Sequence, residues 1–169
     1  MDVKIVFLDF DGVLNHIAGA DANRAVDAPI EPARPDSAAA RIDPVAVERI
    51  NVLLRRTDAQ IVVSSTWRDQ YSLEELRAML VFRGLAFPER IIDVTPQMWR
   101  DDRVRRHDRG REIQSWIDSH PGIEEFVIID DNNDMLHLLP LLVQTSMERG
   151  LLDEHIEIAV AILGETARG

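Results

Sequence analysis

Five short apolar segments, separated by longer segments of mixed polarity, set the pattern of hydrophobic and polar positions along this chain. Each is rich in β-branched residues and lacks strict alternation of apolar and polar positions. This pattern predicts strands that are buried on both faces, as in a parallel sheet. The predicted strands are residues 3–8, 60–65, 90–95, 125–131 and 141–145.

The segments between and after these strands carry helix signals. Asp43 is a suitable N-cap before Pro44, and Ser72 with Glu75 forms a capping-box pattern. Strands that alternate with helices predict an α/β fold with a doubly wound (Rossmann-like) parallel sheet of about five strands and helices on both faces. The predicted helices cover about 43–56, 72–84, 109–119 and 152–163.

Residues 16–41 interrupt this alternation. They contain nine alanines and prolines at positions 29, 32 and 35, a spacing that no continuous helix tolerates. We expect a short flap, flexible or partly extended, because the segment is too short for a large cap domain. With 169 residues, the chain is expected to form one domain over 1–169.

The composition of the chain disfavours membrane proteins and proteins that bind polyanions over a broad surface. Hydrophobic residues make up 46% and charged residues 29%, which is typical of a globular protein. No apolar run approaches the roughly 20 residues that span a bilayer, so no membrane partner is expected. The absence of cysteine and of a signal peptide favours a cytoplasmic location. A formal net charge of −11 disfavours broad binding to a polyanion.

Acidic and hydroxyl side chains follow three of the predicted strands. They are Asp9 and Asp11, Ser64 and Ser65, and Asp130 and Asp131. Ligand sites in such sheets lie outside the carboxyl ends of the strands, so these residues are expected to converge there. The repulsion between two acidic loops requires a cation, and ligands that offer only oxygen favour Mg²⁺. An aspartate beside a magnesium-bound phosphate can attack phosphorus and form an aspartyl-phosphate.

Three of these segments resemble the motifs of a known superfamily. "DFDGVLN" resembles the first motif of the haloacid dehalogenase (HAD) phosphohydrolases, "IVVSS" the second and "FVIIDDNND" the fourth. They occur in the family's order over positions 5–134. "SSTWR", "RGREIQSWI" and "VIIDD" are similar, more narrowly, to the HAD domains associated with Swiss-army-knife RNA repair proteins.

The resemblance implies roles for the first two motifs. Asp9 would be the nucleophile and a Mg²⁺ ligand. Asp11 would donate a proton to the leaving oxygen, later accept one from water, and bind the metal through its backbone carbonyl. The hydroxyl of Ser64 and the amide of Ser65 would bind a phosphoryl oxygen, although a shift of one position between the two serines stays open. Gly12 permits the sharp turn that exposes backbone N–H groups to phosphate.

In the fourth motif, the resemblance implies that Asp130 is the metal ligand. Asp131 or Asp134 would support it, directly or through water. Each of the three motifs has a plainer structural alternative, namely an Asx-rich or serine-rich turn at the end of a strand.

The family also uses a cation, commonly a lysine, beside the nucleophile and phosphate. The single lysine, Lys4, lies about 16 Å from Asp9 on an extended strand, at the wrong end of the sheet. An arginine is therefore expected instead. We choose Arg109, with Arg106 second, because Arg109 continues the apolar helical stripe toward the carboxyl edge of the sheet. That stripe consists of Ile113, Trp116 and Ile117.

Several other residues have two interpretations. Trp67 and Arg68 either line the mouth of the site or form a packed tryptophan beside an exposed arginine. The remaining arginines of this region form either a solvated loop or a docking patch for a phosphorylated substrate. They are Arg100, Arg103, Arg105 and Arg111.

These features favour a Mg²⁺-dependent phosphomonoester hydrolase that acts through an aspartyl-phosphate. A short flap leaves an open site, which suits large substrates such as nucleic-acid phosphate ends or phosphoproteins. The alternatives are a phosphoacceptor signalling module and a catalytically silent phosphate-binding module. The first would carry its adjacent acidic pair after the first strand, whereas this chain carries it late. The second would not need the acid–base aspartate.

Overall fold

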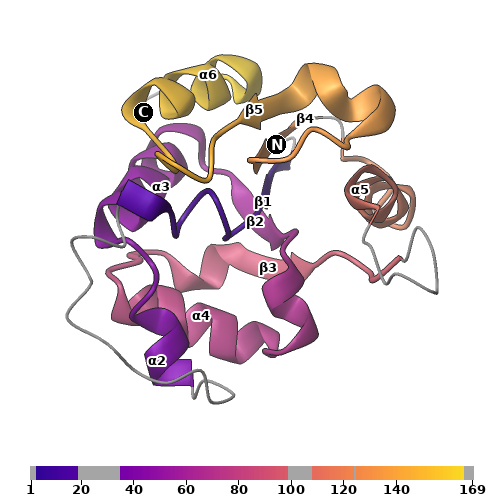
Figure 1. The fold of residues 1–169 in the computed structure, drawn as a ribbon. Coiled ribbons are helices and arrows are strands. Elements are labelled where there is room, and N and C mark those ends of the chain that lie inside the picture. Colours follow the sequence, from indigo (N-terminus) through magenta and orange to yellow (C-terminus); the bar gives the residue numbers. More distant parts are fainter. Residues whose placement is uncertain (1–2, 19–34, 99–107, 124, 166–169) are drawn as a thin grey trace.

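A parallel sheet of five strands forms the centre of the fold (Figure 1). The computed structural model describes residues 3–18, 35–98, 108–123 and 125–165. The strand order is β3-β2-β1-β4-β5, and every neighbouring pair is parallel. The strands are β1 (Lys4–Leu8), β2 (Gln60–Val63), β3 (Ile91–Val94), β4 (Glu125–Asp130) and β5 (Leu142–Gln144). The predicted fold class is confirmed, and the strands are a little shorter than expected.

The order of the strands creates one switch point in the sheet. From the central strand β1, the chain first adds β2 and β3 on one side and then β4 and β5 on the other. The carboxyl ends of β1 and β4 therefore flank the place where the direction of winding reverses. Open α/β sheets bind their ligands at such a point.

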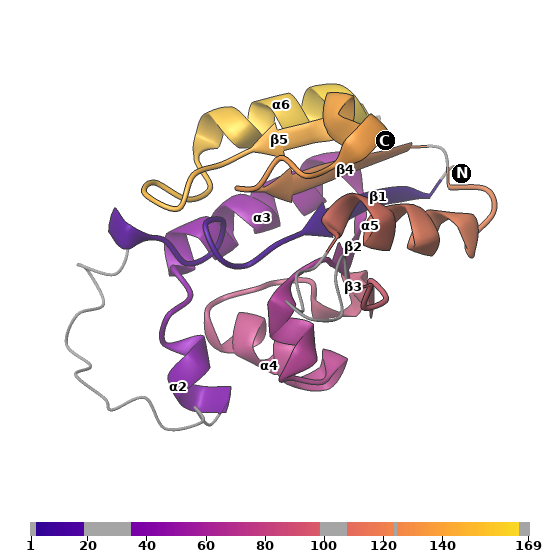
Figure 2. The ribbon, with the colours of Figure 1, turned by 45° about the vertical axis from the view of Figure 1, so that its right-hand side comes forward.

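Helices cover both faces of the sheet (Figure 2). One face packs against α3, α4 and α6, and the other packs against α5 and the 3₁₀ helix η3. Burial of Ile5 and Phe7 on the second face and of Val6 and Leu8 on the first explains why β1 is apolar throughout. The helices are α3 (Pro44–Thr57), α4 (Leu73–Phe82), α5 (Arg109–Asp118), α6 (Asp153–Leu163) and η3 (Leu136–Leu141).

The caps that the sequence indicated begin the helices. The Asp43 carboxylate accepts a hydrogen bond of 2.9 Å from the Val45 amide, and Pro44 is the first residue of α3. Ser72 and Glu75 form both hydrogen bonds of the capping box at α4. Among the described residues, no helix is long and apolar enough to cross a bilayer.

The end of the predicted flap is helical rather than extended. Residues Pro35–Ala39 form α2, which packs against α4 through buried alanines. Proline is tolerated in the first turn of a helix and alanine favours the helix, so this outcome agrees with the composition of the segment. The part of the flap from 19 to 34 lies outside the described residues. The described residues show no large cap.

Candidate active site

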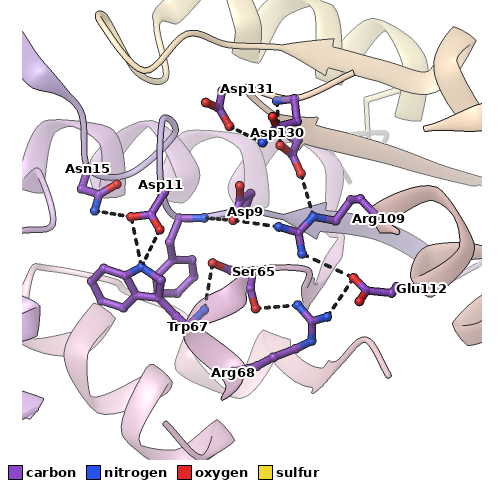
Figure 3. A network of polar contacts seen from close by, with 12 residues as sticks. Asp9, Asp11, Asn15, Ser65, Trp67, Arg68, Arg109, Glu112, Asp130 and Asp131 are labelled. Carbon is purple, nitrogen blue, oxygen red and sulfur yellow. Dashed lines mark hydrogen bonds and ion pairs between the residues drawn. The ribbon is translucent and has the colours of Figure 1, made fainter. Parts of the chain in front are cut away.

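The ends of β1, β2 and β4 bring the predicted site residues together at the switch point (Figure 3). The sheet pairing continues just beyond the strands. The Asp9 amide donates to the Ile129 carbonyl at 3.0 Å, and the Ser64 amide donates to the Leu8 carbonyl at 2.8 Å. Backbone hydrogen bonds therefore fix the start of each loop.

Three carboxylates form a cluster that fits a small divalent cation. Asp9, Asp130 and Asp131 each offer an oxygen, and these oxygens lie within 4.8 Å of one another. An octahedral ion with metal–oxygen distances of about 2.1 Å requires ligand separations of about 3–4 Å, so small adjustments suffice. Asp130 is fully buried, and its Oδ2 receives no well-aligned hydrogen bond from the described residues. The donor set and this buried oxygen both suit a hard cation.

The same carboxylates resist ionisation when no cation is present. Burial raises the pKa of Asp9 to about 6, although Arg109 and hydrogen bonds from Ser65 and Phe10 oppose the shift. Burial and the neighbouring Asp9 raise the pKa of Asp130 to about 8. A bound cation would stabilise the ionised forms, because opposite charge lowers a carboxyl pKa.

Gly12 allows the β1 loop to approach the β4 loop closely. Its φ is +73°, and a Cβ at this position would lie 2.5 Å from Cγ of Asp131. On the other side, the Thr145 hydroxyl donates a 2.7 Å hydrogen bond to the Gly12 carbonyl. Only glycine combines this backbone conformation with the close contact to a candidate ligand.

Arg109 lies at the start of α5 and points into the cluster (Figure 3). Its Nε is 3.2 Å from Asp130 Oδ2, and its Nη2 is 3.8 Å from Asp9 Oδ1. The side chain is buried, so water screens these charges weakly. Arg109 thus lies beside the acidic cluster, at the edge of the sheet toward which the helical stripe points.

A buried acid, Glu112, contacts the guanidinium of Arg109 beside the acidic cluster. The sequence did not predict this contact. Glu112 is fully buried, and its Oε2 lies 3.5 Å from Arg109 Nη1 and 2.8 Å from Arg68 Nη2. Its Oε1 also accepts a 3.0 Å hydrogen bond from the Met98 amide. A signal existed, because Glu112 is three residues after Arg109 and directly before Ile113 on the same stripe.

Arg68 is buried, so the alternative of an exposed arginine is wrong. Its side chain is only 2% exposed. Besides Glu112, it binds the Ser65 carbonyl through Nη1 at 2.6 Å. Arg68 thereby joins the loop after β2 to helix α5, because the buried carboxylate of Glu112 attracts it inward.

The Asp11 carboxylate is held on the opposite side of Asp9 from Arg109 (Figure 3). The Trp67 indole Nε1 lies 3.1 Å from both of its oxygens, and the Asn15 amide donates to Oδ1 at 2.6 Å. Trp67 is also packed against Phe10, with ring centroids 5.2 Å apart. Trp67 therefore combines both interpretations, as a packed residue and as a contact of a site residue.

The two serines differ in their surroundings. The Ser65 hydroxyl hydrogen-bonds to Asp9 and accepts a 3.4 Å hydrogen bond from the Trp67 amide. The Ser64 hydroxyl is buried and has no hydrogen-bond partner among the described residues. Of the two serines between which the resemblance left the assignment open, Ser65 is therefore the one whose hydroxyl lies beside the candidate nucleophile.

Asp134 is not one of the three clustered carboxylates, and the structure does not describe Arg106. The Asp134 carbonyl accepts a 3.1 Å hydrogen bond from the Gly110 amide, and its carboxylate acts on Arg109 electrostatically. Arg106 lies outside the described residues, as do Arg100, Arg103 and Arg105. Arg111 is exposed, with Nε 3.5 Å from Asp108 Oδ2.

Comparisons with known proteins agree with this arrangement. Neither the comparison with curated proteins nor that with solved structures gives a match. A family model described as "HAD domain in Swiss Army Knife RNA repair proteins" matches residues 5–156, which include the carboxyl ends of all five strands. The match covers well over half of the chain, and the chain therefore belongs to this family of HAD domains.

Proposed function

We propose that this protein is a Mg²⁺-dependent phosphomonoester hydrolase that acts through an aspartyl-phosphate on Asp9. One observation carries the proposal: the buried Asp9 carboxylate belongs to the acidic cluster and lies 3.8 Å from Arg109, with the Ser65 hydroxyl beside it. A nucleophile needs this environment when its target carries negative charge, because cations and hydroxyl groups stabilise the phosphoryl oxygens. Membership in the HAD family supports a hydrolase of this class.

The metal would neutralise charge on the phosphoryl group and on the three carboxylates of the cluster. Asp9 attacks phosphorus, and the bond from phosphorus to the leaving oxygen breaks with its electron pair on that oxygen. Asp11 gives a proton to this oxygen. Asp11 then takes a proton from water, which attacks phosphorus and releases inorganic phosphate and the free Asp9 carboxylate.

The other residues hold these groups in place. Arg109 would bind phosphoryl oxygens while remaining oriented by Glu112, and the Ser65 hydroxyl would donate to one of them. The hydrogen bonds from Trp67 and Asn15 keep the Asp11 carboxyl at a fixed position. We further propose that the substrate is large, such as a nucleic-acid phosphate end or a phosphoprotein, as an open site allows.

Hydrolysis of para-nitrophenyl phosphate tests this function directly. The wild-type protein is expected to turn over the substrate with Mg²⁺ and to lose activity in EDTA. Asp9→Asn should reduce kcat by at least about 1,000-fold, because an amide cannot serve as the nucleophile. Glu148→Gln removes one exposed negative charge elsewhere and should leave the rate unchanged.

Trapping of the intermediate separates the enzyme from its alternatives. Acid-quenched protein should carry phosphate on Asp9 during steady-state turnover. Binding of phosphate without turnover would favour the silent phosphate-binding module, and one stable phosphorylation without turnover would favour the phosphoacceptor. A substrate screen with phosphorylated oligonucleotides, phosphopeptides and sugar phosphates would then define the substrate class.

A further inference from the structure

A pocket of about 130 Å³ adjoins Asp11. Besides Asp11, two segments line it. The end of α2 with the turn after it contributes Arg41, and the 3₁₀ helix η1 (Thr66–Asp69) with its end contributes Trp67 and Gln70. Ligand sites commonly measure about 300–1,000 Å³, so this pocket holds one small group and not a whole ligand.

The pocket combines a positive charge with an aromatic surface. The guanidinium carbon of Arg41 lies 5.5 Å from the centroid of the Trp67 ring, within the range of a cation–π contact. Arg41 is exposed, and no carboxylate of the described residues forms an ion pair with it. In a chain with a net charge of −11, this cation attracts an anionic group into the pocket.

Asp11 connects this pocket to the proposed chemistry. In the proposed reaction, Asp11 protonates the leaving oxygen, so that oxygen must lie within hydrogen-bond reach of its carboxyl. Asp11 is also part of the pocket wall, and Trp67 contacts it through Nε1. Figure 3 shows Asp11 and Trp67 on one side of Asp9 and Arg109 on the other. The pocket therefore lies on the leaving-group side of the site.

We infer that this pocket binds a second phosphoryl group on the leaving group, with Arg41 as its main cationic contact. The inference rests on the proposed function, because it uses Asp11 to assign the leaving-group side. The substrate would then be a phosphomonoester with another phosphate or phosphodiester nearby. A free bisphosphate and a phosphorylated nucleic-acid end both offer this chemistry.

The test compares substrates with one and two phosphoryl groups. The quantity of interest is the ratio of kcat/KM for adenosine 3′,5′-bisphosphate to kcat/KM for the better of adenosine 3′- and 5′-monophosphate. We expect this ratio to exceed one in the wild type and to fall about tenfold or more in Arg41→Gln, as for the loss of a charge-assisted hydrogen bond. Arg149→Gln, an exposed arginine outside the pocket wall, should preserve the ratio.

Two further measurements separate failure of this inference from failure of the proposed function. An unchanged ratio in Arg41→Gln, with para-nitrophenyl phosphate still hydrolysed, overturns the inference and leaves the proposed function intact. If the wild type hydrolyses none of these compounds, the proposed function fails. In that case, the Kd of the bisphosphate for Asp9→Asn, measured by calorimetry, tests whether the pocket binds a phosphoryl group without relying on catalysis. A Kd that rises about tenfold on adding Arg41→Gln supports the pocket, and an unchanged Kd rejects it.

A phosphorylated trinucleotide identifies the source of the second phosphate. If its kcat/KM exceeds that of the bisphosphate and this advantage also depends on Arg41, the second group is the phosphodiester of a nucleic-acid end. The reverse order assigns the pocket to a free bisphosphate. The preference for the bisphosphate or for the trinucleotide should weaken as the salt concentration rises, because the proposed contact of Arg41 with the second phosphate is exposed and ionic.

Discussion

Without a divalent ion, the folded state of this protein should lose stability as the pH rises from 6 to 8. The pKa of Asp130 is raised to about 8 by burial and by Asp9, whereas an aspartate in the unfolded chain titrates near 3.8. Across this range, the folded protein therefore holds a proton that the unfolded chain has released. Stability from such a raised pKa is lost as the pH rises toward the folded-state value.

The expected size of this loss follows from one proton. Each proton held only by the folded state changes the free energy of unfolding by about 1.4 kcal/mol per pH unit. Between pH 6 and pH 8 the contribution of Asp130 falls by about 2 kcal/mol, because the folded protein has released half of this proton at pH 8. This is a large fraction of the 5–15 kcal/mol that stabilises a typical domain. Asp9, with a pKa of about 6, adds its main contribution below this range.

Urea unfolding in EDTA at pH 6, 7 and 8 measures the effect. Asp130→Asn should remove most of the slope, because the amide has no proton to lose. Glu148→Gln removes the same formal charge from an exposed position and should retain the slope. Burial lowers the pKa of His155, and this contribution is the same in all three proteins. Saturating Mg²⁺ should stabilise the wild type more at pH 8 than at pH 6. A wild-type slope in EDTA equal to that of Asp130→Asn would refute the reasoning.

Two substitutions test other contacts of the site. Gly12→Ala should weaken Mg²⁺ binding in calorimetry because the new Cβ meets the Asp131 carboxyl, whereas Gly122→Ala has positive φ but open space and should lower only stability. Equal Mg²⁺ affinity in both variants would contradict the close approach. Glu112→Gln should lower the free energy of unfolding by about 3–5 kcal/mol, since it leaves buried arginines such as Arg109 without their shared counter-charge. A loss below about 1 kcal/mol in urea unfolding would contradict this role of the Glu112 charge.

Local patterns predicted the parts of the molecule that depend on local physics. Apolar strands that end in acids or serines place those residues at one edge of a parallel sheet, whatever the order of the strands. The helical stripe of α5 likewise indicates the buried side of the helix, on which Arg109 lies. The prediction for residues 16–41 failed in part because alanines and a proline at the helix start favour α2.

Contacts between distant segments were not predictable in the same way. A glutamate in the first turn of a helix is ordinarily solvated, whereas Glu112 is buried against Arg68, which reaches it from the loop after β2, and against the Met98 amide. The contact of Trp67 with Asp11 joins positions 56 apart and requires the turn of η1. Neither contact follows from periodicity, since each depends on how separate elements pack.

Calorimetric titration of the EDTA-treated protein with Mg²⁺ tests the central claim that Asp9 and Asp130 share one ion. We expect one ion per chain in the wild type, with binding at least about tenfold weaker in Asp130→Asn and unchanged in Glu148→Gln. Binding to Asp130→Asn with wild-type affinity and stoichiometry would contradict it.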